Sequence, residues 1–115
     1  MHNNKRTSRR YDLELPLKYY VRGNQSFSST VASDNISAGG IGFTGRCFIP
    51  PSTNLMLELM VAKKSISSIG KVAWVNVSSR SNKYKLGVEF LEMNPMDREY
   101  LKKYLSGCGA PEAQQ

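Results

Sequence analysis

Apolar and polar residues alternate over several short stretches of the chain, each bounded by glycine, proline or a run of polar residues. The clearest stretch begins at Leu13, from which leucine and tyrosine occupy every second position up to Tyr19. A period of two residues is typical of a β-strand with one buried face. The sequence therefore predicts six strands, at about 13–20, 27–33, 41–43, 55–61, 69–77 and 84–91.

Single residues refine this pattern. Pro16 cannot donate a backbone hydrogen bond, so it predicts an edge strand or a bulge. Residues 34–40 interrupt the second stretch before extended structure resumes. Alternation in the fifth stretch places Trp74 on the same face as Val72, which indicates a core position. Aromatic residues expected in the core are Tyr19, Phe43, Trp74 and Phe90.

The segment after residue 91 differs from the strands, because its apolar residues recur with a helical period. Asn94 is a suitable N-cap, and Pro95 suits the first helical position. Gly107 is a natural terminator. The sequence thus predicts a C-terminal helix from Pro95 to about Gly107, followed by a disordered tail over 108–115.

Six strands and one helix in 115 residues indicate a single all-β domain, either an antiparallel barrel or a sandwich. No apolar run reaches the ~18 residues that a membrane-spanning helix needs, and the N-terminus does not resemble a signal peptide. We therefore expect a cytoplasmic protein with reduced cysteines, of which Cys47 is buried.

The net charge of +7 is unevenly distributed. Residues 1–10 contain four Lys or Arg residues and no acidic residue, which predicts a flexible basic arm over 1–12, ahead of a folded unit over 13–107. A second basic region runs from Lys63 to Lys85 without a carboxylate. Excess positive charge favours anionic partners, although a solvated surface explains the second region equally well.

The sequence gives little support to catalysis or metal binding. The single histidine is His2, so a Ser-His-Asp triad, a Cys-His pair or a histidine-ligated metal site would depend on that one side chain. We expect a protein that is not an enzyme and that holds no metal or cofactor.

Two short motifs stand apart from the strand pattern. Arg6 and Arg10 lie four residues apart in the arm, and the planar, charged guanidinium suits phosphate and the edge of guanine. Residues 35–40 read N-x-S-x-x-G, and Asn35 and Ser37 can leave the same face of an extended segment. Each motif alone is weak evidence, since a solvated tail and an ordinary Asx-type turn contain the same residues.

Together and in this order, the two motifs make the chain resemble the PilZ domain family, whose members are receptors for the bacterial second messenger cyclic di-GMP. The resemblance extends from about Lys5 to Leu105. It includes residues 70–75 (Gly-Lys-Val-Ala-Trp-Val) and 84–90 (Tyr-Lys-Leu-Gly-Val-Glu-Phe), which are similar to strand signatures of the family. It implies a six-stranded antiparallel β-barrel with one C-terminal helix.

The resemblance also implies how a ligand is bound. Arg6 and Arg10 would bind the guanine and phosphate groups of cyclic di-GMP. Asn35 and Ser37 would contact the ligand from the barrel surface, and Gly40 would shape the turn. Lys5 and Arg9 are further candidates next to the arginines.

The expected partners are therefore cyclic di-GMP and a protein effector, to which the arm relays the signal by becoming ordered when the ligand binds. The alternatives are a protein-interaction adaptor and a basic barrel that binds single-stranded nucleic acid. The nucleic-acid alternative is less favoured, because the aromatic residues that would stack on bases occupy core positions.

Overall fold

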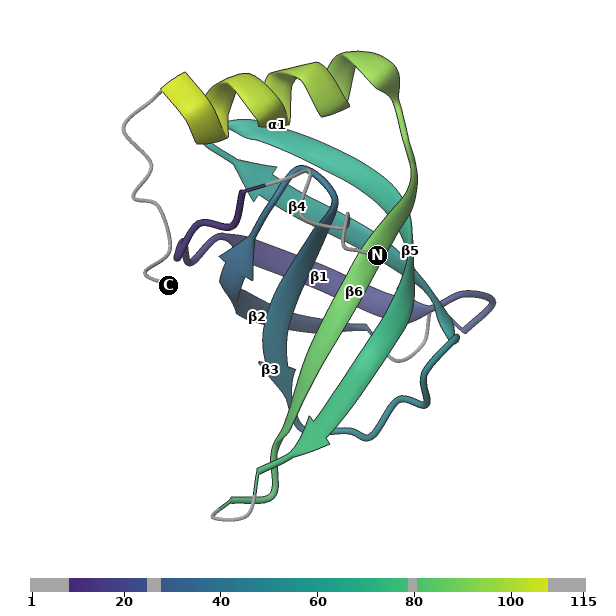
Figure 1. Ribbon diagram of the computed structural model, residues 1–115. Coiled ribbons are helices and arrows are strands. Elements are labelled where there is room, and N and C mark those ends of the chain that lie inside the picture. The colour runs from purple at the N-terminus through teal and green to yellow at the C-terminus, as the bar shows by residue number, and fades with distance from the viewer. Residues whose placement is uncertain (1–8, 25–27, 79–80, 108–115) are drawn as a thin grey trace, which may run out of the picture.

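The computed structural model describes residues 9–24, 28–78 and 81–107. Six antiparallel strands close into a barrel in the order β1-β2-β3-β6-β5-β4, with β4 hydrogen-bonded to β1 (Figure 1). The elements are β1 (Pro16–Val21), β2 (Ser29–Ile36), β3 (Gly40–Gly45), β4 (Asn54–Val61), β5 (Lys64–Val77), β6 (Tyr84–Met93) and α1 (Pro95–Gly107). The predicted all-β barrel with a C-terminal helix is confirmed, and the sandwich alternative is excluded.

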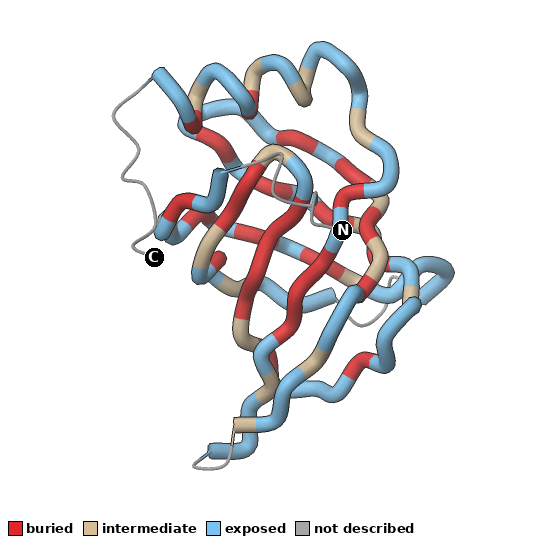
Figure 2. Tube along the Cα trace, viewed as in Figure 1, coloured by how far each residue is buried: buried red, intermediate tan, exposed pale blue. Residues whose placement is uncertain are grey.

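Buried residues recur along all six strands (Figure 2), and their apolar side chains form the core of the barrel. Strand β4 follows the predicted alternation most simply, with four buried apolar side chains at every second position from Leu55 to Val61. The rings of Tyr19 and Phe43 pack with centroids 4.7 Å apart. Burial raises the pKa of the Tyr19 phenol, and a hydrogen bond with Ser29 acts in the opposite direction. Tyr19, Phe43 and Phe90 are buried, as predicted.

Helix α1 begins and packs as its sequence predicts. The Asn94 side-chain oxygen accepts a hydrogen bond from the Met96 backbone N–H at 2.8 Å, which caps the helix N-terminus. Leu101 and Leu105 are buried, so this face of the helix joins the barrel core. The helix lies across one end of the molecule, shown at the top in Figure 1.

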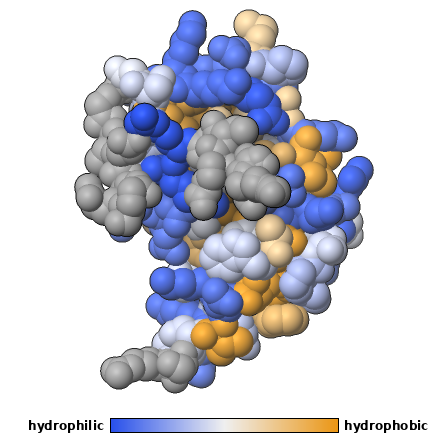
Figure 3. Space-filling view, viewed as in Figure 1, coloured by the Kyte–Doolittle hydropathy of each residue, from blue (hydrophilic) through white to orange (hydrophobic). Residues whose placement is uncertain are grey.

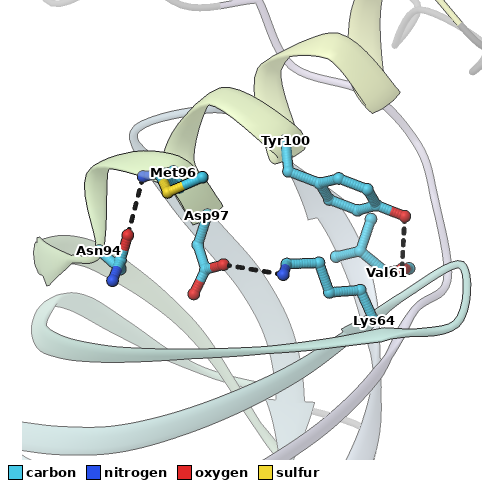
Figure 4. Close-up of polar contacts among 6 residues, drawn as sticks. All are labelled: Val61, Lys64, Asn94, Met96, Asp97 and Tyr100. Atoms are coloured by element: carbon cyan, nitrogen blue, oxygen red, sulfur yellow. Dashed lines mark hydrogen bonds and ion pairs between the residues drawn. The ribbon is translucent and has the colours of Figure 1, made fainter.

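Polar contacts fix α1 to the hairpin that joins β4 and β5 (Figure 4). The Lys64 ammonium lies 3.4 Å from the Asp97 carboxylate and 5.6 Å from the centroid of the Tyr100 ring. The Tyr100 hydroxyl donates to the Val61 carbonyl oxygen at 3.5 Å. These contacts, together with the buried leucines, place the start of α1 beside the β4–β5 hairpin and the end of β6.

Several details differ from the predictions. Strand β5 begins at Lys64, five residues earlier than predicted, because it pairs with the whole length of β4. Pro16 is the first residue of β1, and the barrel leaves that strand no free edge. Cys47 is exposed, so its predicted burial was wrong. Among the described residues, no helix is long and apolar enough to cross a membrane.

Candidate functional site

A bulge in β2 sets the direction of the Asn35 side chain. Ser33 lies opposite Phe43 and Asn35 lies opposite Gly42, so Asp34 is an extra residue between two consecutive pairs. One extra residue reverses the alternation of a strand. Ser33 is accordingly buried inside the barrel, while Asn35 covers Gly42 on the outer surface.

A second bulge, in β5, does the same for Trp74. Val72 lies opposite Val88 and Trp74 lies opposite Gly87, which makes Ala73 the extra residue. Val72 is buried, but Trp74 is 43% exposed, so the predicted core position of Trp74 was wrong. A Cβ atom on Gly87 would lie 2.3 Å from the indole, which shows that the indole rests on the Gly87 backbone.

The two bulges place their residues on one line across the barrel surface. Asn35, Gly42, Gly87 and Trp74 are successive partners on β2, β3, β6 and β5, and we call these four residues the outer row. Neighbouring strands are ~4.8 Å apart, so the Cα atoms at its ends are separated by roughly 14 Å. Because its two central residues are glycines, no side chain of the row itself rises between the Asn35 amide and the Trp74 indole.

Arg10 contacts the Asn35 end of this row. Tyr11 is buried and pairs with Ile36, exchanging backbone hydrogen bonds of 2.8 and 2.9 Å. This pairing brings Arg10 beside Asn35, whose side-chain oxygen accepts a hydrogen bond from Arg10 Nη1 at 2.6 Å. The Asn35 amide N–H₂ remains a potential donor to a ligand. An exposed guanidinium and an amide therefore lie together at this end of the row.

Ser37 lies in the turn between β2 and β3, because β2 ends at Ile36, and Gly40 follows the turn as the first residue of β3. Ser37 is only 5% exposed, and its hydroxyl oxygen accepts from the backbone N–H groups of Gly39 and Gly40 at 3.1 and 3.2 Å. A Cβ atom at Gly40 would lie 2.5 Å from the Val88 carbonyl oxygen. In this structure both residues therefore hold the turn against β6.

Arg98 reaches the same turn from helix α1, a contact that the sequence analysis missed. Its Nη1 donates to the Ala38 carbonyl oxygen at 3.2 Å, while the Phe90 N–H donates to the Gly39 carbonyl at 2.9 Å. Arg98 also lines a groove of about 580 Å³ on the outer face of β4, β5 and β6. No local pattern indicates a partner 60 residues away, so only the fold could reveal this contact.

The remaining predicted site residues are Lys5, Arg6 and Arg9. Arg9 is exposed next to Arg10. Lys5 and Arg6 lie outside the described residues, as does most of the predicted basic arm. Among residues 9–24, 28–78 and 81–107, no group of three or more His, Cys, Asp or Glu side chains could hold a metal ion. The side chains that do gather here offer hydrogen bonds, positive charge and an aromatic face.

A family model supports the resemblance found in the sequence. The model of the PilZ domain matches residues 4–107 of the chain. No curated protein gives a significant match.

Solved structures of other proteins have the same fold. MotI/DgrA, an inhibitor of motility from Bacillus subtilis, is 22% identical with a TM-score of 0.74 over 90% of this chain and 51% of its own. The K. pneumonia MrkH–c-di-GMP complex is 18% identical with a TM-score of 0.68, over 90% of this chain and 51% of MrkH. The PilZ domain of Escherichia coli YcgR with c-di-GMP is 13% identical with a TM-score of 0.64, over 87% of this chain and 88% of that one. The chain thus spans about half the length of MotI and MrkH.

Proposed function

The chain belongs to the PilZ domain family, and from this premise we propose that it is a receptor for cyclic di-GMP. The observation that carries the proposal is the Arg10–Asn35 hydrogen bond at one end of the outer row, with an exposed indole at the other end. Cyclic di-GMP combines two phosphates with two flat guanines. A guanidinium, an amide and an indole supply a partner for each kind of group.

The roles of the individual residues follow from their positions. Arg10 and Arg6 bind the phosphates and guanine edges, and Asn35 donates from its free amide N–H₂. Trp74 offers an exposed face on which a guanine stacks. Ser37 and Gly40 act through the shape of the turn, and Lys5 and Arg9 add positive charge nearby.

The proposal also includes a mechanism by which ligand binding is signalled to a protein effector. The four cations of residues 1–10 repel one another, and a ligand with two negative charges offsets that repulsion. Tyr11 is joined to Ile36, so a segment that precedes it starts directly beside Asn35. We therefore expect ligand binding to order residues 1–10 over the site and to create a new surface for a protein effector. The proposed role is that of a receptor rather than an enzyme.

Fluorescence of Trp74, the only tryptophan of the chain, provides the test of binding at this site. Titration with cyclic di-GMP should quench this fluorescence in a saturable manner at micromolar or lower concentration, because a stacked guanine quenches an indole. GTP and a linear dinucleotide should do so much more weakly. Isothermal titration calorimetry on the same samples measures affinity and stoichiometry, and the absence of any heat or quenching would disprove the proposal.

Amide hydrogen exchange tests the relay separately. Protection of residues 5–10 should rise on ligand addition, while β5 should change little. Deletion of residues 1–10 should abolish tight binding and leave the circular dichroism of the barrel unchanged. If cyclic di-GMP bound tightly but the amide protection of residues 5–10 did not change, the receptor function would be supported and the ordering of the arm would be rejected.

A further inference from the structure

Exposed apolar side chains gather at the end of the barrel remote from α1, where β3 ends and the β5–β6 hairpin turns (Figure 1). Phe48 is 54% exposed and Val77 is 69% exposed. Both contact Tyr84: Val77 is its partner on β5, and the Phe48 ring meets the Tyr84 ring edge-on with centroids 5.8 Å apart. Figure 3 shows hydrophobic atoms at this lower end, side by side with hydrophilic ones.

This apolar surface is held in place by the residues around it. Ile49, next to Phe48, is 6% exposed and belongs to the core. The segment that follows is bonded to β5, since Ser52 N–H donates to the Val72 carbonyl at 2.7 Å and Val72 N–H donates to Thr53 at 2.9 Å. Phe48 is therefore presented to solvent from a fixed backbone. A preformed apolar surface loses little conformational entropy when a partner binds.

The same end of the molecule is positively charged. Arg46, Lys83 and Lys85 are exposed, and none of them forms an ion pair with a described residue. The sequence contains no Asp or Glu over 35–57 or over 59–88, the segments that build this end. Asp34 on β2 accepts a hydrogen bond from Thr44, the cross-strand neighbour of Lys85.

We propose that this basic tip, formed by Arg46, Phe48, Val77, Lys83, Tyr84 and Lys85, is a docking surface for an acidic segment of a partner protein. An apolar side chain of the partner packs against Phe48 and Val77, while flanking carboxylates face the cations. Charge complementarity of this kind speeds association and selects the partner. Exposed apolar residues rimmed by charge are a common form of protein interface.

The surface suits a protein better than a nucleic acid. Proteins that bind single strands place successive aromatic faces along a positively charged groove. In the tip the Phe48 ring is already in contact with Tyr84, and the more exposed of its two exposed apolar residues is the aliphatic Val77, which offers no face to a base. On β6, Tyr84 lies three positions and Lys85 two positions from Gly87 of the outer row, about 10 Å and about 7 Å away, so the tip is adjacent to the outer row but shares no residue with it.

Fluorescence anisotropy with labelled probes tests this proposal on the full chain. The probes are a short peptide of Leu and Glu, the same peptide with Lys in place of Glu, and a short oligo-dT. We expect the acidic peptide to bind at micromolar concentration. The basic peptide and the oligonucleotide should bind at least about tenfold more weakly.

Charge-reversal variants locate the binding surface. The double variant Lys83→Glu/Lys85→Glu should weaken binding of the acidic peptide by about tenfold or more. The matched control is Lys63→Glu/Lys103→Glu, which makes the same change in net charge at exposed positions near α1 and should have less than about a twofold effect. Phe48→Ser should also weaken binding, whereas Met96→Ser, at a residue that is 80% exposed, should not.

Each contrary result rejects the proposal in a different way. Equal weakening by the two double variants would mean that net charge alone drives binding. Binding of oligo-dT that is lost in Lys83→Glu/Lys85→Glu would assign the tip to nucleic acid. Failure of the acidic peptide to bind would reject the tip as a docking surface for acidic segments. Thermal unfolding of every variant verifies that the barrel remains folded, and cyclic di-GMP binding should be unchanged in Phe48→Ser and Met96→Ser.

Discussion

The outer row and the β2–β3 turn lie side by side, but they use their polar groups in opposite ways. Arg10 is exposed and Asn35 half-buried, and the row keeps an amide donor and an indole face on the surface. Ser37 is buried, and its hydroxyl oxygen is occupied by two backbone N–H groups of its own turn.

This difference shows that one sequence motif contains two kinds of residue. In N-x-S-x-x-G, the asparagine faces the surface where a ligand can reach it, whereas the serine and the last glycine determine the path of the backbone. Substitution of Arg10, which contacts the row from the exposed surface, should therefore change ligand affinity alone. Substitutions in the turn should change folding stability first and affinity as a consequence.

Arg10→Ala should have the largest effect on ligand affinity and almost none on folding stability. Cyclic di-GMP binding should weaken by about 10- to 100-fold, because a good bidentate guanine contact is worth roughly 1–3 kcal/mol. The melting temperature should barely change, since the side chain is exposed. Calorimetry and thermal unfolding measure the two effects, with Arg22→Ala, at an exposed position after β1, as the control. A large drop in melting temperature would assign Arg10 to the fold instead.

Gly40→Ala should show the opposite behaviour. The added Cβ would lie 2.5 Å from the Val88 carbonyl oxygen, and backbone atoms cannot move away without breaking the β3–β6 pairing. We expect a loss of about 1–3 kcal/mol in the free energy of unfolding, and a fall of roughly 5–20 °C in melting temperature. Gly107→Ala is the matched control, because a Cβ there meets nothing within 4 Å. An unchanged melting temperature for Gly40→Ala would contradict the steric role.

Ser37→Ala should have a smaller effect of the same kind. The Gly39 and Gly40 N–H groups lose their side-chain acceptor, which costs about 1–2 kcal/mol of stability for partly buried donors. Their amide exchange should accelerate, and ligand affinity should fall less than in Arg10→Ala. Ser106→Ala is the control, since the Ser106 hydroxyl bonds to an exposed helix carbonyl. If affinity fell as far as in Arg10→Ala with no change in exchange, Ser37 would belong with the ligand-facing residues.

Arg98→Ala is expected to have the smallest effect and tests whether α1 supports the turn. Loss of the hydrogen bond to the Ala38 carbonyl should weaken ligand binding by about twofold to fivefold and should accelerate amide exchange in the turn. Lys102→Ala, one turn further along α1, should change neither. Unchanged exchange in Arg98→Ala would show that the turn is held by Ser37 and β6 alone.

The sequence by itself determined the features that depend on neighbouring residues. Strand β4 follows its two-residue period, and α1 begins at Pro95 after the Asn94 cap and ends at Gly107 as predicted. The side chain of an N-cap acts within one turn, and strand alternation acts between adjacent residues, so both can be read from local sequence. Residue type and order also indicated Arg10 and Asn35 as candidate ligand contacts, and that role stays a prediction.

Only the tertiary structure decided which faces of the strands those residues occupy. Alternation predicted that Trp74 shares the buried face of Val72, but the bulge at Ala73 turned it outward beside Gly87. The bulge at Asp34 likewise turned Asn35 outward. Whether a strand accommodates an extra residue depends on its pairing with a distant partner strand, and one extra residue moves every later side chain to the other face. That pairing is absent from the local pattern, so the outer row could only appear once the barrel had closed.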